Sequence, residues 1–320
     1  MTPDGGSAPP VRFAPLATMM LPVGDGHTLY VETIGNSRGT PMVFLHGGPG
    51  SGCQPSHREL FDPDRCYAVL FDQRGAGRSV PGGERLANTT AHQIADMELI
   101  RATLGIDRWV VVGGSWGATL ALAYAEIHPE RVGGLILRAT FLGTRAELEV
   151  AFGATLRRLY PELWADFIGL LPSSERGDHL THYWRRILDP DPAMHRPAAI
   201  AWHDTERILS VAHPTGTRLD AATMAASAGP LPRTPFMEAY YFERDCFLRP
   251  TQLLDEAGRL RSIPGIIVQG ELDHLCPPPQ VEALAKLWPK AELQIIPDAG
   301  HSLGEPAISA AVRAAIARFA

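Results

Sequence analysis

Three residue types that nucleophilic catalysis needs occur at widely separated positions of this sequence. A serine lies in the pattern Gly113-x-Ser115-x-Gly117, and an aspartate and a histidine follow at Asp273 and His301. A serine hydroxyl is a weak nucleophile near neutral pH, so it needs a base within hydrogen-bond reach and a group that orients the base. We therefore predict Ser115 as a nucleophile, His301 as its general base and Asp273 as the acid that orients the histidine.

The segment around Ser115 has the pattern of a strand, a tight turn and a helix. An apolar run over 110–112 precedes the turn, and an alanine-rich stretch over 118–125 follows it. This context places a serine on a strained corner with its hydroxyl pointing into a cleft. Side chains at Gly113 and Gly117 would collide with neighbouring backbone in so sharp a turn. The simpler alternative is a glycine-rich turn with an incidental serine, and the context favours the catalytic interpretation.

Asp273 and His301 each follow a predicted strand. The strand predicted over 264–269 ends shortly before Asp273, and the strand predicted over 292–296 ends shortly before His301. The partners of such a serine follow it in the order acid, histidine, on loops after later strands. Either residue alone could be an ordinary loop residue, but both at these places favour catalysis. Competing candidates for the two roles rank lower by position: Glu271, Asp298 and His274.

Backbone N–H groups are also predicted to bind the oxygen that becomes negative when a carbonyl is attacked. One donor should be the N–H of Trp116, directly after the serine. The other should come from the glycine-rich loop over 46–50, where the substrate must approach the backbone closely. We favour Gly47, with Gly48 as the alternative. A loop that is only a tight turn is the simpler explanation, but it gives no reason for three clustered glycines.

The elements that must position these residues follow from the order of apolar runs and amphipathic stretches. Short apolar runs predict buried strands, and helical patterns lie between several of them. Such alternation is typical of a mostly parallel, doubly wound α/β sheet. The predicted buried strands are 41–45, 67–71, 109–113, 132–137, 264–269 and 292–296.

Residues 144–249 interrupt this alternation. They contain no convincing buried strand but several amphipathic helical stretches. Nine prolines, Pro197 among them, should divide the region into short helices. We predict a helical cap over 144–249, inserted into a sheet domain that 1–143 and 250–320 form together.

Composition limits the classes of protein to consider. The 320 residues are 45% hydrophobic and 20% charged, which suits one large α/β core with an insertion. The formal net charge of −6 predicts binding to neither nucleic acid nor an anionic membrane. No apolar run reaches the length of a membrane span, and residues 13–23 lack the features of a signal peptide. We therefore expect a cytoplasmic protein.

Cysteines and histidines add no further chemistry. The four cysteines are scattered, without a Cys-x-x-Cys pair, which favours free thiols in a reducing compartment. The twelve histidines include no His-Glu-x-x-His pattern. No metal site is predicted.

Longer motifs spread over the chain match one known pattern. They are His46-Gly47-Gly48-Pro49-Gly50, Asp72-Gln73-Arg74-Gly75-x-Gly-x-Ser79, Asn88-Thr89-Thr90, Gly113-Gly114-Ser115-Trp116-Gly117, Leu137-Arg138-x-x-Phe141-Leu142, Cys276-Pro277, Leu287-Trp288-Pro289 and Ala299-Gly300-His301-Ser302. Together they resemble the proline iminopeptidases, also called prolyl aminopeptidases, of the α/β-hydrolase superfamily. The resemblance covers nearly all of the chain after residue 20. It implies an α/β-hydrolase fold with a cap, and removal of N-terminal proline through a prolyl-enzyme ester, without a metal or organic cofactor.

The resemblance also implies roles in the cap. In that family two cap glutamates bind the positively charged N-terminus of the substrate, and Glu206 and Glu238 match them. Thr205 stands where the family has a tryptophan, and the residues around Glu238 differ from its pattern. Phe141, Tyr240 and other aromatic residues of the cap are then expected to line an apolar slot for proline. The expected partners are peptides with a free N-terminal proline.

Two other functions are compatible with the same residues. An esterase or broader amidase could keep the scaffold with a diverged cap. A binding protein of this fold could hold a small ligand without turnover, although the intact Ser115, Asp273 and His301 argue against it. Comparing proline, alanine and acetyl-proline arylamides with short esters would separate these possibilities.

Overall fold

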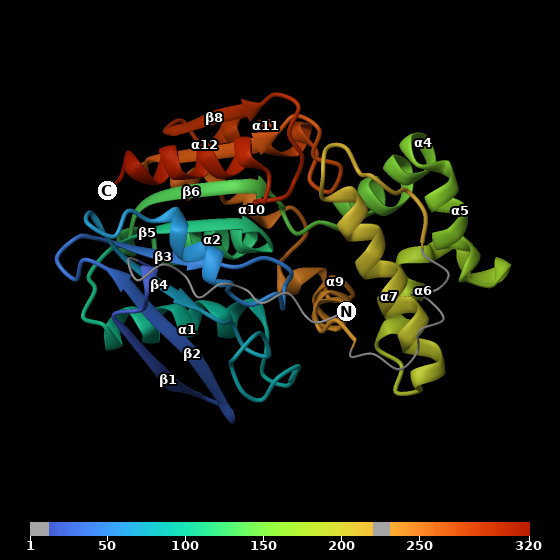
Figure 1. The fold of residues 1–320 in the computed structure, drawn as a ribbon, viewed down its shortest axis with the longest axis horizontal. Coiled ribbons are helices and arrows are strands. Elements are labelled where there is room, and N and C mark those ends of the chain that lie inside the picture. Colours follow the sequence, from blue (N-terminus) through green and yellow to red (C-terminus); the bar gives the residue numbers. More distant parts are fainter. Residues whose placement is uncertain (1–12, 220–230) are drawn as a thin grey trace.

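The computed structural model describes residues 13–219 and 231–320, and these contain one eight-stranded sheet (Figure 1). The strand order is β1-β2-β4-β3-β5-β6-β7-β8. Strands β3 to β8 run parallel, whereas β1 and β2 are antiparallel to their neighbours. The prediction of a mostly parallel sheet is confirmed. The strands are β1 (Ala17–Gly24), β2 (His27–Gly35), β3 (Thr40–Leu45), β4 (Cys66–Phe71), β5 (Trp109–Ser115), β6 (Val132–Thr140), β7 (Gly265–Gly270) and β8 (Ala291–Ile296).

Helices cover both faces of the sheet, which makes it doubly wound. Because successive side chains of a strand point to opposite faces, Val111 packs in one apolar cluster and Val110 and Val112 in the other. The cluster of Val111 includes side chains of α1, α2 and α11, and the opposite cluster includes side chains of α12. These helices are α1 (Thr90–Thr103), α2 (Trp116–Ile127), α11 (Pro278–Leu287) and α12 (Pro306–Ala317).

Strand register brings the predicted site loops to one edge of the sheet. Leu45 of β3 pairs with Gly113 of β5, and Phe44 pairs with Leu70 of β4. The loops after β3 and β4 therefore begin beside the turn that carries Ser115. On the other side of β5 lie β6, β7 and β8 in that order, so the loops after β7 and β8 open at the same edge.

Between β6 and β7 the described residues form helices and no strand. Figure 1 shows α4 to α7 beyond the carboxyl ends of β5 and β6. The helices are α3 (Arg145–Glu149), the π-helix η4 (Val150–Thr155), α4 (Leu156–Leu159), α5 (Pro161–Gly169), α6 (His179–Ile187), α7 (Pro192–Leu209), α9 (Thr234–Phe242) and α10 (Gln252–Asp255). The parts of the predicted cap and sheet domain at 220–230 and 1–12 lie outside the described residues.

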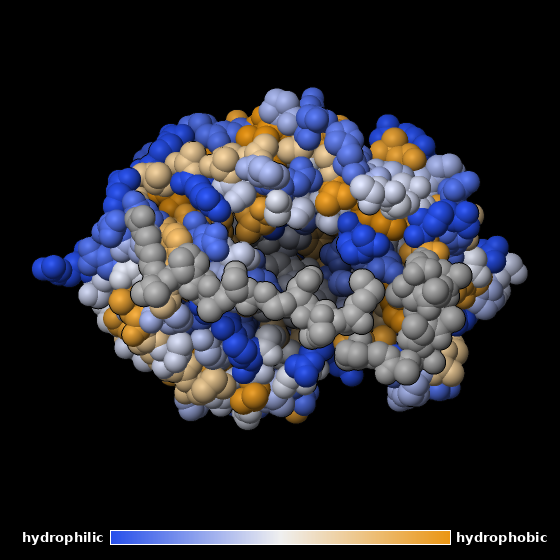
Figure 2. Space-filling model, in the orientation of Figure 1, coloured by the Kyte–Doolittle hydropathy of each residue, from blue (hydrophilic) through white to orange (hydrophobic). Residues whose placement is uncertain are grey.

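The short 3-10 helices connect these elements. They are η2 (Pro55–Leu60), η3 (Pro129–Arg131), η5 (Ser173–Asp178), η6 (Asp245–Phe247) and η7 (Ala257–Leu260). On the face seen in Figure 2, hydrophobic side chains of the described residues lie in scattered groups between hydrophilic ones. None of the described helices is both long enough and apolar enough to span a membrane.

Pro197 lies inside α7, so the prediction that this proline helps divide the region into short helices was wrong. A proline within a helix removes one backbone hydrogen bond at a cost of about 3 kcal/mol. The same helix buries Trp202, Ile208 and Leu209. Burying side chains of this size contributes about 2 kcal/mol or more each, which offsets the lost hydrogen bond.

Candidate active site

Ser115 ends β5 and directly precedes α2, as the sequence predicts. Its backbone has φ 55° and ψ −125°, a conformation that is rare for a residue with a side chain. A β-carbon at Gly117 would overlap the carbonyl oxygen of Leu45, and one at Gly113 would overlap the carbonyl oxygen of Gly117. Both glycines are therefore required by close backbone approach, and the predicted collisions are confirmed. The packing of β3 against this turn holds the strained serine in place.

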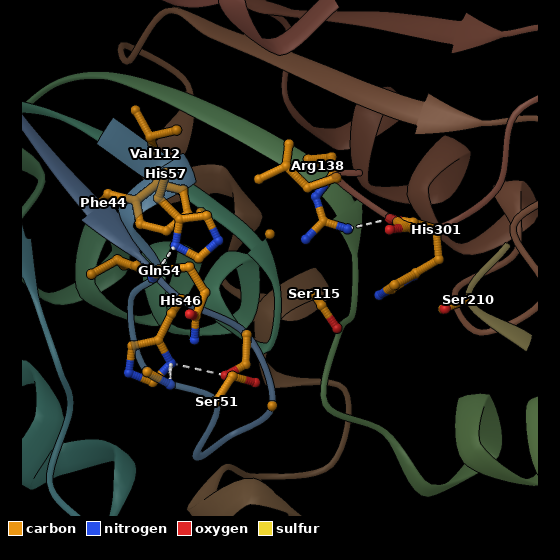
Figure 3. A pocket seen from close by; sticks show the side chains of 18 of the residues that line it. Phe44, His46, Ser51, Gln54, His57, Val112, Ser115, Arg138, Ser210 and His301 are labelled. Atoms are coloured by element: carbon orange, nitrogen blue, oxygen red, sulfur yellow. Dashed lines mark hydrogen bonds between the residues drawn. The ribbon is translucent and has the colours of Figure 1, made fainter. Parts of the chain in front are cut away.

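The side chain of Ser115 faces a cavity of about 320 Å³. His301, from the loop after β8, lines the same cavity. In Figure 3 the Ser115 hydroxyl and the His301 ring point toward one another. The structure thus brings together two residues that are far apart in the sequence.

Asp273, in the loop after β7, meets the other side of the His301 ring. The Nδ1 atom of His301 lies 2.9 Å from Oδ2 and 3.1 Å from Oδ1 of this carboxylate. A carboxylate only accepts, so Nδ1 carries the proton and Nε2 is left as an acceptor. The backbone N–H groups of Leu275 and Cys276 donate to Oδ1 of Asp273 at 3.0 and 2.8 Å. The carboxylate is therefore held in a fixed orientation.

The three competing candidates have other contacts. Glu271 accepts a hydrogen bond from the backbone N–H of Asp298 at 3.1 Å. The carboxylate of Asp298 pairs with exposed His213 at 2.7 Å. The ring of His274 packs edge-on against Tyr160. The structure places Asp273, and none of these three, against His301.

The two predicted oxyanion donors flank Ser115. A β-carbon on Gly47 would lie 3.4 Å from the carbonyl oxygen of Gly114 and 3.6 Å from Cβ of Ser115. Trp116 is the first residue of α2, and its N–H is one of the helix N-terminal groups without an intrahelical acceptor. Gly48, the alternative to Gly47, lines the same cavity. Neither glycine N–H donates to a backbone carbonyl within the described part of the chain.

Glu206 and Glu238 come from α7 and α9 and lie close together. Glu206 lines the cavity of Ser115, whereas Glu238 is buried and accepts a hydrogen bond from the Trp202 indole N–H at 2.8 Å. Among the described residues, no donor reaches Oε1 of Glu238. Burial raises the pKa of Glu206 to about 7. Burial and the neighbouring Glu206 carboxyl raise the pKa of Glu238 well above its usual range.

A smaller apolar recess of about 30 Å³ adjoins Ser115. Phe141 lines it, as the sequence predicts. Its other lining residues are Gly48, Ser115, Leu148, Ala151, Phe152, Glu206, Phe242, Leu275 and Cys276. Two of its rings, Phe152 and Phe242, belong to the aromatic residues of the predicted cap but were not named individually as site residues. Apolar cap residues at helical spacing are more often simple core, so no sequence pattern distinguishes those that face a cavity.

Tyr240 is placed differently from the other predicted site residues. Within the described ranges it belongs to neither the lining of the large cavity nor that of the recess. Its ring packs against Phe247 at a centroid distance of 5.4 Å, and the Arg244 guanidinium lies 4.5 Å from the ring centre. The structure does not bring Tyr240 together with Ser115.

Arg138 lines the large cavity and was not predicted as part of the site. It lies on β6, and its guanidinium donates a hydrogen bond to the backbone carbonyl of His301 (Figure 3). This bond holds the loop that presents the histidine. Over residues 13–219 and 231–320, no group of three or more His, Cys, Asp or Glu is arranged to hold a metal ion.

Comparisons with known proteins agree with this architecture. The family model described as the alpha/beta hydrolase fold matches residues 40–306. A proline iminopeptidase of Xylella fastidiosa is 44% identical over 290 residues, which cover 90% of this chain and 91% of that protein. A probable proline iminopeptidase of Leptolyngbya boryana is 42% identical, with coverage of 96% and 95%.

Solved structures show the same fold. A proline iminopeptidase-related protein of Thermus thermophilus is similar with a TM-score of 0.60 and 25% identity, covering 95% of this chain and 98% of that one. An esterase of a Rhodococcus species shares the fold with a TM-score of 0.61 at 19% identity, again covering 95% and 98%. The chain therefore belongs to the α/β-hydrolase superfamily and, within it, to the proline iminopeptidase family of enzymes.

Proposed function

We propose that this protein is a serine aminopeptidase that releases N-terminal proline from peptides. The observation that carries the proposal is the shared cavity: the Ser115 hydroxyl, the His301 ring and the Glu206 carboxyl all line it. Such a cavity joins a nucleophile and its base to a group that can bind the ammonium of a free N-terminus. The names of the curated relatives support proline as the residue removed.

The proposed reaction begins with proton transfer from Ser115 to Nε2 of His301 as the hydroxyl attacks the prolyl carbonyl. Asp273 orients the imidazole and stabilises its charged form. The N–H groups of Gly47 and Trp116 bind the resulting oxyanion. His301 then protonates the departing amine, which leaves a prolyl ester on the serine. Water hydrolyses this ester by the same steps in reverse and regenerates the hydroxyl.

The glutamate pair explains selectivity for chain ends in this proposal. With Glu238 protonated and Glu206 ionised, the pair carries one negative charge, which the substrate ammonium neutralises. An internal peptide bond or an acylated N-terminus offers no such charge and leaves the partly buried Glu206 carboxylate unpaired. The apolar recess lined by Phe141 contacts the pyrrolidine ring.

Replacing Glu206 with Gln should weaken binding of the free N-terminus. We expect KM for proline para-nitroanilide to rise about 100-fold with a smaller change in kcat, because an ion pair in a largely desolvated site is lost. Steady-state kinetics on Glu206→Gln measure both values. The matched control is Asp204→Asn, two residues earlier on α7, whose carboxylate pairs with Arg207. An unchanged KM in Glu206→Gln would contradict the binding role.

The same carboxyl should make substrate binding depend on pH. The raised pKa of Glu206, about 7, means that the carboxylate is present above this pH and lost as the pH falls through it. KM for proline para-nitroanilide should therefore rise by about tenfold per pH unit below the pKa of Glu206. The rise should be absent in Glu206→Gln. A wild-type KM that stays constant from about pH 8 to about pH 6 would contradict the assignment.

A substrate panel tests the proposed activity directly. The purified protein should hydrolyse proline para-nitroanilide, with much lower kcat/KM for the alanine compound and none detectable for the acetyl-proline compound. Rapid hydrolysis of para-nitrophenyl acetate without cleavage of proline para-nitroanilide would indicate an esterase instead. No turnover of any of these substrates would favour a binding protein.

A further inference from the structure

Gln73 is a buried residue in the loop after β4 that contacts two other segments of the candidate site. It follows β4 and is 1% exposed. Its Nε2 donates to the carbonyl oxygen of His46 at 3.0 Å, and its Oε1 accepts from the Trp116 indole N–H at 2.9 Å. Its backbone N–H donates to Nε2 of His46 at 3.0 Å. One residue thus joins the loop after β3 to the first turn of α2.

The partners fix the orientation of the Gln73 amide. An indole N–H can only donate, so the atom that faces Trp116 must be the amide oxygen. A backbone carbonyl can only accept, so the atom that faces His46 must be the amide nitrogen. The amide oxygen therefore acts as an acceptor and the amide nitrogen as a donor, and the opposite orientation of the amide would lose both hydrogen bonds.

The same contacts orient the peptide that carries the first oxyanion donor. The carbonyl held by Gln73 and the Gly47 N–H belong to one peptide unit. Cis peptides in the described chain occur only before Pro49 and Pro81, so this unit is trans and its N–H points away from Gln73. Gly47 borders the serine, since a β-carbon added to it would lie 3.6 Å from Cβ of Ser115.

The His46 ring fixes the next peptide in the same way. Its Nε2 accepts from the Gln73 backbone, so in the neutral ring the proton is on Nδ1. In this tautomer Nδ1 donates to the Gly47 carbonyl oxygen at 2.9 Å, and the Gly52 N–H, which lies 3.2 Å from Nδ1, cannot donate to it. Burial lowers the pKa of His46, which keeps this ring neutral. Both carbonyl groups that flank the Gly47 N–H are thus held by Gln73 or by a ring that Gln73 orients.

We propose that Gln73 is a positioning residue that holds the Gly47 N–H toward the oxyanion and couples it to Trp116, the residue that supplies the second donor. This inference rests on the proposed serine mechanism. Without the Gln73 amide, the peptide between His46 and Gly47 can rotate and replace the donor by a carbonyl oxygen. The oxyanion would then lose one hydrogen bond, and only in the transition state.

The isosteric variant Gln73→Glu tests this directly. Burial raises the pKa of the introduced carboxyl, so kcat is measured at alkaline pH, where the carboxyl is ionised. The carboxylate still accepts from the indole, but its second oxygen repels the His46 carbonyl and favours rotation of the peptide. Gln73→Met has a similar length and makes neither hydrogen bond. Loss of one oxyanion donor lowers kcat by about 10²- to 10³-fold. We expect a loss of this size for proline para-nitroanilide in both variants, with KM within about threefold of wild type.

Two inhibitors separate positioning from a general loss of structure. Pyrrolidine-2-boronic acid forms a tetrahedral adduct with the serine and places an oxygen in the oxyanion site, whereas free proline binds as a product. Gln73→Glu should weaken the boronate about 100-fold and leave the Ki of proline unchanged. The matched control is Gln93→Glu, another buried glutamine to glutamate change, in α1. It should lower Tm without the loss in kcat.

The results that would overturn the role of Gln73 differ from those that would overturn the proposed function. Wild-type kcat in folded Gln73→Glu and Gln73→Met, or equal weakening of boronate and proline, would overturn the positioning role. If neither variant can be recovered folded, Trp116→Phe takes their place. It keeps the backbone N–H but removes the indole donor, and the boronate and proline inhibition constants are compared in the same way. If wild-type protein cleaves para-nitrophenyl acetate but not proline para-nitroanilide, the proposed function fails. The comparison of kcat is then made on the ester, which uses the same oxyanion site.

Discussion

Replacing Ser115 with Ala should abolish release of para-nitroaniline from proline para-nitroanilide, with kcat lower by about 10⁶-fold. The hydroxyl is the atom that bonds to the prolyl carbonyl, and no other group in the proposed reaction can take its place. The small side chain fits the same corner, so the fold and substrate binding should persist. Steady-state kinetics and binding of proline measure the two properties separately.

Ser210 provides the matched control for this variant. It lines the same cavity, and its hydroxyl donates to the backbone carbonyl of Arg207 at 2.8 Å. Ser210→Ala should therefore keep kcat within a few-fold of wild type. Turnover by Ser115→Ala within about tenfold of wild type would contradict the nucleophile assignment, because triad serines contribute several orders of magnitude more.

Replacing Asp273 with Asn should lower kcat at neutral pH by about 10⁴-fold. An asparagine at this position can present its amide N–H to Nδ1 of His301, which favours the tautomer with the proton on Nε2. That tautomer cannot accept the proton of Ser115. The measurement is kcat for proline para-nitroanilide, with Tm determined for the same preparation.

The competing acidic residues serve as controls for Asp273→Asn. Glu271→Gln and Asp298→Asn change carboxylates that the structure keeps away from His301. Both variants should retain kcat within a few-fold of wild type. A loss of activity in Asp298→Asn comparable to that expected for Asp273→Asn would show that the acid was assigned to the wrong residue.

The edge of the sheet that carries the site and the tight turn at Ser115 could be predicted, because backbone geometry allows few other conformations there. At Gly113 and Gly117 a side chain would overlap neighbouring backbone, so the glycines mark the turn in the sequence itself. Parallel strands all end at one edge of their sheet, which allowed Asp273 and His301 to be placed near Ser115 from strand order alone.

The interior of the helical region could not be predicted in the same way. Tyr240 and Tyr241 are adjacent on α9, and helical geometry turns neighbours by about 100°, so only packing decides which ring faces the site. Both rings pack against Phe247, but only Tyr241 also packs against Trp116. The prediction at Pro197 was wrong for a related reason, because burial of the apolar face of α7 outweighs the cost of a proline within the helix.

The positions of the two glutamates could be predicted, but their protonation could not. The resemblance to known aminopeptidases pointed to Glu206 and Glu238, but their protonation depends on burial that no sequence pattern reports. The Trp202 indole, which donates to Glu238, is one of the features that only the folded chain provides. Its stacking on Phe152, with ring centroids 4.1 Å apart, fixes that donor.

Intact-mass and peptide-mass analysis after treatment with diphenyl pyrrolidine-2-phosphonate, a serine-directed proline analogue with a free amine, tests the nucleophile and the free-amine requirement together. We expect one covalent adduct, located on Ser115. The N-acetylated reagent should leave the protein unmodified under the same conditions. An adduct on another residue would contradict the assignment of Ser115, and equal labelling by the acetylated reagent would contradict recognition of the free amine.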